Sequence, residues 1–126
     1  RYRGVQMRLF ESGATRDNDE GKYDLEGFLS PLVIERYAEY MHKHRVQADG
    51  KLRDSDNWQK GIPLKTYFSS FMRHSMDAWF IHRGYRRFDK KDGHEIFMDE
   101  ALSAILFNIS GYLHTILKAK NENKVG

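Results

Sequence analysis

The feature that most constrains the fold is the stretch from Ala101 to Leu117, which contains no charged residue. As a helix it would be apolar on almost every side, whereas a surface helix of a globular protein has a single apolar stripe. It is shorter than a membrane span of about 20 apolar residues, and it contains Asn108, Gly111 and His114. We therefore expect no membrane contact. The stretch predicts either a buried central helix or a helix at an interface between identical chains.

Two other segments have the apolar spacing of helices. The first is expected over Pro31–Val46, with Ser30 as its N-cap. The second is expected over Pro63–His82, and Gly84 is a suitable stop signal. Both prolines of the chain thus stand in a first helical turn, where a missing N–H is tolerated. The apolar stretch belongs to a third helix, which we expect over His94–Ala119.

These segments predict an all-α fold, a helical bundle with an irregular N-terminal arm. The 126 residues fit a single domain better than two. We expect residues 1–27 to form a polar arm, 28–119 the helical core and 120–126 a mobile tail. Residues 7–10 alone have the pattern of a short extended piece. Three helices make a small core, so we expect a second copy of the chain to cover the apolar helix in a homodimer or homotetramer.

Composition excludes several classes of function. The chain has no cysteine, which rules out a disulfide scaffold, a zinc ribbon and a cysteine nucleophile and is compatible with a reducing compartment. The formal net charge of +3 is a mild surplus, so we do not expect nucleic acid as the main partner. No charged-then-apolar segment opens the sequence, so we expect no secretory signal peptide. It also lacks the common phosphate-binding and zinc-binding motifs.

Glu35 and Glu39 are the first candidates for chemistry. Residues four apart lie on one face of a helix, about 5–6 Å from each other. Two negative charges at that distance repel each other unless a cation lies between them. Mg²⁺ and Mn²⁺ prefer carboxylate oxygens. The pair therefore indicates either a metal site or an ordinary solvated helix face.

Further candidates lie on the second and third helices. Arg73, His74 and Asp77 fall within one turn. Arg73 and Asp77 have the spacing of a simple ion pair, whereas His74 is a ligand, a phosphate contact or a core histidine. Glu100 follows Asp99 near a helix start, where acidic residues favour the helix dipole. The alternative is that Glu100 adds a carboxylate to the same cation.

The loop before the second helix adds candidates for ligand binding. In Asn57-Trp58-Gln59-Lys60, a tryptophan face can stack on a base and a lysine can contact a phosphate. The alternative is that Trp58 covers the core beneath the loop. Asn108, inside the apolar stretch, needs a partner because an unpaired buried amide costs about 1–3 kcal/mol. That partner is either structural or a ligand group.

Several blocks of the sequence are similar to a known family and occur in that family's order. They are Ser12-Gly13-Ala14-Thr15-Arg16-Asp17, Asn57-Trp58-Gln59-Lys60-Gly61-Ile62-Pro63, Arg73-His74 and Glu100-Ala101-Leu102-Ser103-Ala104-Ile105-Leu106-Phe107-Asn108. Together they span about residues 11–115. The chain resembles the phage-associated dATP/dGTP diphosphohydrolase N-terminal family, which is MazG-like.

The resemblance implies an all-α nucleoside triphosphate pyrophosphohydrolase in the cytoplasm of a bacterium or phage-infected cell. In that superfamily, carboxylates from adjacent helices hold Mg²⁺ or Mn²⁺, and a metal-activated water releases pyrophosphate and leaves the nucleoside monophosphate. By position, Glu35 and Glu39 match the paired carboxylates of the first catalytic helix. Glu100 stands where the family usually has Asp, and His74 with Asp77 has the spacing of the second acidic pair.

The resemblance also implies a purine substrate, dATP or dGTP. The residues implied to contact the nucleotide are Asn57, Trp58, Lys60, Arg73, His74 and Asn108. Arg16 and Lys22 of the polar arm would fold over the nucleotide or over a neighbouring subunit. Two alternatives stay open: a nucleotide-binding module without turnover, and a small helical protein that associates with nucleic acid.

Overall fold

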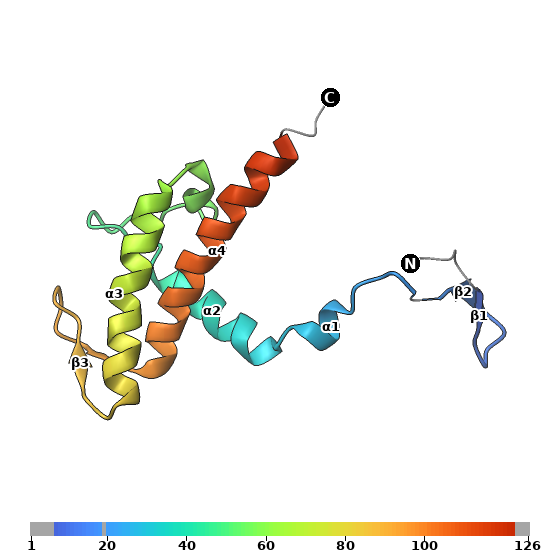
Figure 1. The fold of residues 1–126 in the computed structure, drawn as a ribbon, viewed down its shortest axis with the longest axis horizontal. Coiled ribbons are helices and arrows are strands. Elements are labelled where there is room, and N and C mark those ends of the chain that lie inside the picture. The colour runs from blue at the N-terminus through green and yellow to red at the C-terminus, as the bar shows by residue number, and fades with distance from the viewer. Residues whose placement is uncertain (1–6, 19, 123–126) are drawn as a thin grey trace. The chain divides into compact units, whose positions relative to one another are not determined.

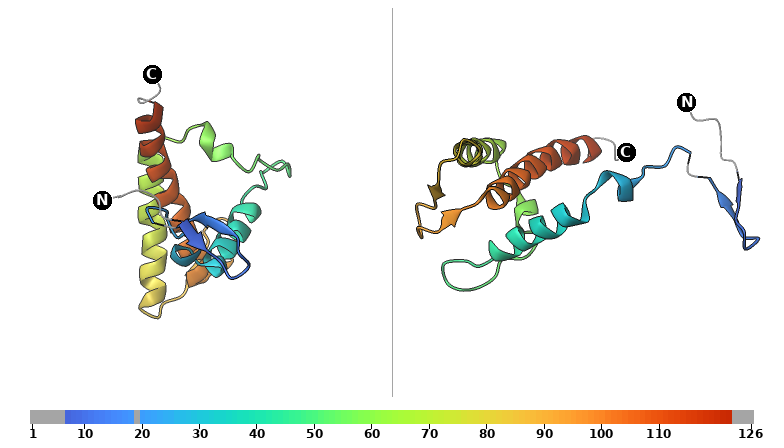
Figure 2. Two further views of the ribbon diagram at one scale, coloured as in Figure 1. Left: turned by 90° about the vertical axis from the view of Figure 1, so that its right-hand side faces the viewer. Right: turned by 90° about the horizontal axis from the view of Figure 1, so that it is seen from below.

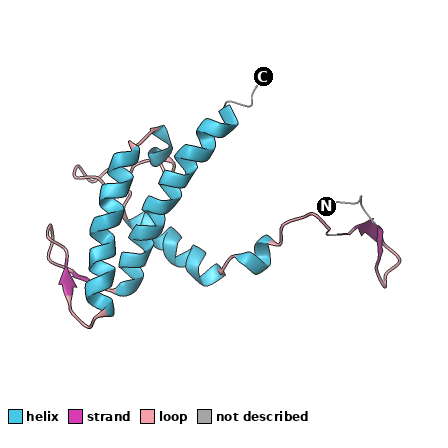
Figure 3. Cartoon of the chain, in the orientation of Figure 1, coloured by secondary structure: helices cyan, strands magenta, loops and turns pink. Residues whose placement is uncertain are grey.

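The computed structural model describes residues 7–18 and 20–122, which are mostly helical (Figure 1). The contacts divide the chain into two compact units, Arg1–Pro31 and Leu32–Gly126. Within the described residues, two small sheets accompany the helices (Figure 3). The all-α expectation is therefore confirmed in its coarse form, a mostly helical chain.

The first unit contains a small hairpin and one helical turn. Strand β1 (Met7–Leu9) pairs antiparallel with β2 (Thr15–Asp17). Helix α1 (Leu25–Phe28) begins after Asp24, whose side chain accepts a hydrogen bond from a main-chain N–H of the first turn. The extended piece expected at residues 7–10 is confirmed by β1. Strand β2, in contrast, lies in the part of the polar arm where we expected no extended piece.

The second unit is built on three longer helices: α2 (Pro31–Lys43), α3 (Leu64–His82) and α4 (Met98–Glu122). A short 3-10 helix, η1 (Asn57–Lys60), precedes α3. The antiparallel strands β3 (Arg87–Phe88) and β4 (Glu95–Ile96) join α3 to α4. Figures 1 and 2 show α3 and α4 side by side, with the β3–β4 hairpin at one end.

The bounds of α3 agree with the prediction to within one residue, but those of the other two helices need correction. Helix α2 ends at Lys43 rather than near Val46, because Val46 pairs with Leu52 in an isolated bridge. Helix α4 begins at Met98 rather than near His94, because the preceding residues form β4. It continues to Glu122, so residues 120–122 of the expected mobile tail are helical. Residues 123–126 lie outside the described residues.

Helices α3 and α4 approach each other closely. Tyr67 of α3 is 1% exposed and lies against Gly111 of α4, where an added Cβ atom would collide with the tyrosine ring. Ala101 and Ala104 continue the buried side of α4. The ring of Phe107 lies 5.8 Å from the ring of Tyr67, in an edge-to-face arrangement. Small residues on α4 therefore create the space that the tyrosine fills.

Helix α4 is buried on one side only. Leu102 and Leu113, both in the uncharged stretch, are about half exposed. The expectation of a buried central helix is therefore wrong for a single chain, and the interface between identical chains stays a prediction. Among the described residues, no helix has both the length and the hydropathy of a membrane-spanning segment.

Candidate functional site

A cavity of about 650 Å³ lies beside the end of α2. It is bounded by the last turns of α2, the loop that follows, η1 and one residue of α4. Two kinds of side chain dominate its lining, the aromatic residues Tyr40, Trp58 and Phe107 and the basic residues His42, His44, Arg45 and Arg53. This combination suits a ligand that joins a flat apolar ring to negative charge.

The loop after α2 holds the basic side of the cavity in place. Nε of Arg45 donates to the carbonyl of Arg53 at 2.8 Å, and Nη1 of Arg53 donates to the carbonyl of His44 at 2.9 Å. Gly50 adopts a φ of 84° in the turn between the two arginines. A guanidinium has five N–H donors. These bonds therefore fix both arginines and leave several donors of each for a ligand.

Trp58 forms the aromatic side of the cavity. Its ring lies 4.8 Å from the ring of His114 on α4, nearly perpendicular to it. Trp58 thus packs on α4 and also borders the cavity, so the two interpretations drawn from the sequence are compatible with each other. Asn57 lines the same cavity. Lys60 is exposed, with its Nζ 3.9 Å from a carboxylate oxygen of Asp54.

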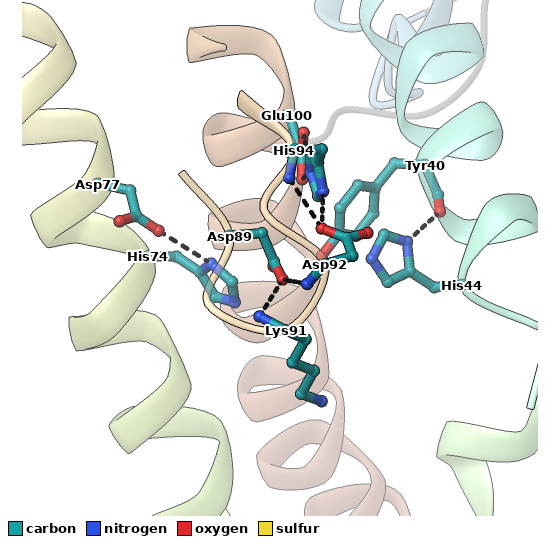
Figure 4. A network of polar contacts seen from close by, with 9 residues as sticks. All are labelled: Tyr40, His44, His74, Asp77, Asp89, Lys91, Asp92, His94 and Glu100. Carbon is teal, nitrogen blue, oxygen red and sulfur yellow. Dashed lines mark hydrogen bonds and ion pairs between the residues drawn. The ribbon is translucent and has the colours of Figure 1, made fainter. Parts of the chain in front are cut away.

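Figure 4 shows titratable side chains from α2, α3 and α4, of which Tyr40 lines the cavity and His44, just beyond α2, lines it as well. Tyr40 lines the cavity, and burial together with the charge of Glu100 raises its pKa to about 12. On α3, Nδ1 of His74 lies 3.8 Å from Oδ2 of Asp77. Burial lowers the pKa of His74 against the opposing effect of Asp77. The imidazole is therefore uncharged at neutral pH and able to accept a proton.

Asp77 has a second partner on the β3–β4 hairpin. Its Oδ1 accepts a hydrogen bond from Nε of Arg87 at 3.0 Å, in a partly buried position. The guanidinium of Arg87 also lies 4.3 Å from the centre of the Phe80 ring. Arg73, the ion-pair partner expected from the sequence, is exposed on α3. The cation that neutralises Asp77 therefore comes from β3 rather than from the same helix.

Glu100 is paired with His94, a histidine that the sequence did not single out. Nε2 of His94 lies 2.8 Å from Oε2 of Glu100, and Nδ1 lies 2.6 Å from Oδ1 of Asp92 (Figure 4). Both ring nitrogens thus face carboxylates. The hydrogen bond with Glu100, and then the one with Asp92, raise the pKa of His94. The His94 ring links the β3–β4 hairpin to the first turns of α4.

This link predicts a pH-dependent contribution to stability. The folded-state pKa of His94 lies above the unfolded value of about 6.5, so the stabilisation is complete below that pH and is lost as pH rises through the folded-state pKa. We expect His94→Gln to lower the free energy of unfolding more at about pH 6 than at about pH 9. Urea unfolding of both proteins measures the difference, with His82→Gln as the exposed control. An equal loss at the two pH values would contradict this account.

Glu35 and Glu39 lie on the exposed side of α2. Nη1 of Arg36 lies 3.4 Å from Oε1 of Glu39, and Nε of Arg36 donates to Oδ2 of Asp99 at 2.7 Å. The hydrogen bond with Arg36 lowers the pKa of Asp99. A guanidinium therefore supplies positive charge between α2 and the start of α4, and it offsets the repulsion that we expected between the two glutamates.

The four predicted metal ligands, Glu35, Glu39, Asp77 and Glu100, do not gather into one coordinating group. In the described parts of the chain, a different set of side chains lies close enough together to share a cation. This set is Asp89, Asp92 and His94, on the loop between β3 and β4. Asp77 and Glu100 are each paired with a basic side chain instead. The predicted ligands therefore do not fit a single metal site within one chain.

The Asp89, Asp92 and His94 group has a structural role in the hairpin. Oδ1 of Asp89 accepts hydrogen bonds from the N–H groups of Lys91 and Asp92, at 2.8 and 3.2 Å. Oδ1 of Asp92 accepts one from the N–H of His94 at 3.0 Å. Such bonds from a side chain to the following backbone are typical of tight turns. The carboxylates thus shape the loop that presents His94 to Glu100.

The remaining predicted residues fall in other places. Asn108 is 4% exposed, and its Nδ2 donates to the carbonyl of Ala104 at 2.8 Å. Its partner is therefore structural and lies one turn earlier in α4. Arg16, in β2, and Lys22 belong to the first unit, where Lys22 is exposed.

The sequence did not single out Arg45 and Arg53, although both line the cavity. The signal that points to them is the dipeptide Asp49-Gly50, which is typical of a tight turn between paired segments. A turn at that point brings residues 45 and 53 opposite each other, as their hydrogen bond shows. Comparisons with protein-family models, with curated proteins and with solved structures find no match for this chain.

Proposed function

We propose that the protein binds a purine nucleoside triphosphate in the cavity and hydrolyses it to the nucleoside monophosphate and pyrophosphate. The observation that carries this proposal is the lining of the cavity, where Trp58 lies in the same space as Arg45 and Arg53. A nucleobase stacks on an aromatic ring, and guanidinium groups bind phosphate oxygens with paired hydrogen bonds. The volume of about 650 Å³ is within the range of small-molecule sites.

Groups suited to hydrolysis lie on α2, α3 and α4 (Figure 4). Tyr40 lines the cavity, and the charge of Glu100 helps to raise the pKa of this tyrosine. His74, uncharged at neutral pH, is a candidate to accept a proton from water. The resemblance of the sequence blocks to a pyrophosphohydrolase family supports Asp77 and Glu100 as catalytic residues and dATP or dGTP as the substrate. It also supports a cytoplasmic location and an assembly of two or four identical chains.

A requirement for Mg²⁺ or Mn²⁺ is part of the proposal, although the four predicted ligands do not meet within one chain. The experiment incubates the protein with each common ribo- and deoxyribonucleoside triphosphate, with Mg²⁺, with Mn²⁺ or with a chelator. We expect consumption of purine nucleotides with either ion and none with the chelator. Equal consumption of purine and pyrimidine nucleotides would overturn the purine preference, and consumption in the chelator would overturn the metal requirement.

A second candidate function is nucleotide binding without turnover. The specific observation in its favour is that two of the predicted catalytic acids are already paired with basic side chains, Asp77 with Arg87 and Glu100 with His94. A protein of this kind would bind a nucleotide through the same cavity and release it unchanged.

Binding itself predicts a change in the fluorescence of one tryptophan. The chain has two, Trp58 in the cavity lining and Trp79 outside it. In the Trp79→Phe protein, Trp58 is the sole source of tryptophan fluorescence. We expect a purine nucleotide to quench this fluorescence because the base stacks on the Trp58 ring. In Trp58→Phe, we expect no response from Trp79. We also expect Trp58→Ala to weaken binding about tenfold, the scale of one base–aromatic stack.

The two single-tryptophan proteins form a matched pair for this titration. A response from Trp79 without one from Trp58 would place the nucleotide elsewhere. No response from either protein, with no heat of binding by calorimetry, would contradict the proposed cavity.

A further inference from the structure

His44 lies one residue beyond the end of α2 and lines the cavity of about 650 Å³. Its ring stacks on the ring of Tyr40, with the two ring centres 4.1 Å apart and the two planes tilted by 31°. Nδ1 of His44 also lies 2.9 Å from the main-chain carbonyl oxygen of Tyr40 (Figure 4). Two contacts with one residue thus hold the imidazole in a single orientation beside the cavity.

The contact between Nδ1 and the carbonyl decides which nitrogen of His44 carries the hydrogen. A carbonyl oxygen only accepts hydrogen bonds, so Nδ1 is the donor. In the neutral ring the other nitrogen, Nε2, then has a lone pair and acts as an acceptor or as a base. Within the described residues, Nε2 has no hydrogen-bond partner. Nε2 of His44 is therefore available to a ligand or to a water molecule.

The backbone places His44 on the basic side of the cavity. Its carbonyl oxygen accepts the hydrogen bond from Nη1 of Arg53 at 2.9 Å, and Arg45 is the next residue in the chain. These two arginines are the side chains to which we assign the phosphates of the nucleotide. The bond that the proposed reaction breaks lies between two phosphates. His44 therefore belongs to the part of the cavity where this reaction would take place.

We propose that Nε2 of His44 is the general base that takes a proton from the attacking water. The water oxygen forms a bond to the α-phosphorus of the nucleotide while its proton moves to Nε2. The bond from the α-phosphorus to the bridging oxygen breaks, and its electron pair leaves with pyrophosphate. Because His44 is exposed, the imidazolium then releases the proton to solvent and the neutral base is restored.

His74 is the competing candidate for this role. It lies on α3, it is not part of the cavity lining, and its Nδ1 lies 3.8 Å from Oδ2 of Asp77. Burial lowers the pKa of His74, and the positive charges of Arg73 and His44 lower it further. A partly buried ring takes up a proton at a greater cost than an exposed ring. His44 therefore combines the better position with the lower cost of carrying the proton.

The inference rests on the proposed function, so the natural protein is first assayed for pyrophosphate release from dATP and dGTP with Mg²⁺. His44→Asn then tests the base without removing the contact with Tyr40. The amide N–H of the new side chain can replace Nδ1 as donor to the carbonyl, but no atom takes the place of Nε2. We expect kcat to fall by about 100-fold or more, with a much smaller change in nucleotide binding measured by Trp58 fluorescence.

Two other histidine variants make the comparison specific. His82→Asn changes an exposed histidine at the end of α3 and should keep the natural kcat. His74→Gln removes the competing base, and we expect a smaller loss of kcat than in His44→Asn.

Free imidazole provides a measurement that a purely structural role of His44 would not change. In His44→Ala, the missing ring leaves space beside Tyr40 that an imidazole molecule from the buffer can occupy. We expect added imidazole to restore part of the lost rate, and to leave the rate of the natural protein unchanged.

The outcomes separate this inference from the proposed function. No pyrophosphate release by the natural protein would overturn both. Hydrolysis by the natural protein with a near-natural kcat in His44→Asn would overturn the inference alone, and a larger loss in His74→Gln would assign the base to His74. A slow His44→Ala protein that imidazole does not accelerate would also contradict the role of His44 as a base.

Discussion

Gly111→Ala should lower the free energy of unfolding by about 1–3 kcal/mol, the usual effect of overpacking a core. A glycine-to-alanine change within a helix normally stabilises it by about 1 kcal/mol. The change in the free energy of unfolding that we expect here therefore has the opposite sign to the change that helix propensity alone predicts. The reason is the Tyr67 ring, which an added Cβ atom would strike and which is 1% exposed. A ring that is enclosed on all sides has no room to move away.

Thermal unfolding measures this effect, and we expect a fall in Tm of about 5–15 °C for a unit of this size. Ser110→Ala is the matched control, because Ser110 is the exposed neighbour of Gly111 in the same helix. We expect the Tm of Ser110→Ala to equal or exceed the Tm of the natural protein. A stabilised Gly111→Ala protein would contradict the close contact between α3 and α4. In the double variant with Tyr67→Leu, the cost of the added methyl group should shrink, because the smaller side chain leaves space.

Glu100→Gln should reduce kcat for the proposed hydrolysis by about 100-fold or more, the scale of a lost acid–base or charged catalytic group. Glu100 lies beside Tyr40 of the cavity lining, where its charge helps to raise the tyrosine pKa. The substitution keeps the size of the side chain and removes its charge. We expect KM for the nucleotide to change much less than kcat, because Arg45 and Arg53 are untouched. Steady-state kinetics with dATP and dGTP measure both constants.

Two further variants make this prediction specific. Glu122→Gln removes an exposed carboxylate at the far end of the same helix and should leave the rate unchanged. His94→Gln removes the partner of Glu100 while leaving the carboxylate itself. A Glu100→Gln protein with near-natural kcat would contradict the catalytic assignment. Equal losses in Glu100→Gln and His94→Gln would show that Glu100 acts by holding the β3–β4 hairpin in place.

The helices that the sequence predicted best are those with local signals at their ends. Pro63 precedes α3, and Gly84 follows it with a φ of 92°, so both bounds could be predicted from single residues. The start of α4 depends on the pairing of Glu95 and Ile96 with β3, which involves two residues on each strand. Such short strands carry no alternating pattern. Their pairing therefore could not be predicted from the local sequence.

The candidate site was predictable only in part, for a similar reason. The residue types at Trp58 and Glu100 drew attention to them, and the structure places Trp58 in a cavity lining. Arg45 and Arg53 reach the same cavity because main-chain hydrogen bonds close a loop between them. The i, i+4 spacing of Glu35 and Glu39 predicts that they share a helix face, but it does not predict which way that face points. In the structure it points to solvent, with Arg36 beside Glu39.

The most direct test of the central claim is the identity of the products formed from dATP or dGTP with Mg²⁺ or Mn²⁺. Separation by ion-exchange chromatography resolves the monophosphate, the diphosphate, pyrophosphate and inorganic phosphate. We expect the nucleoside monophosphate and pyrophosphate in equal amounts, with the reaction abolished in Glu100→Gln. A diphosphate with inorganic phosphate, or a nucleotide that binds at Trp58 and is recovered intact, would contradict the account.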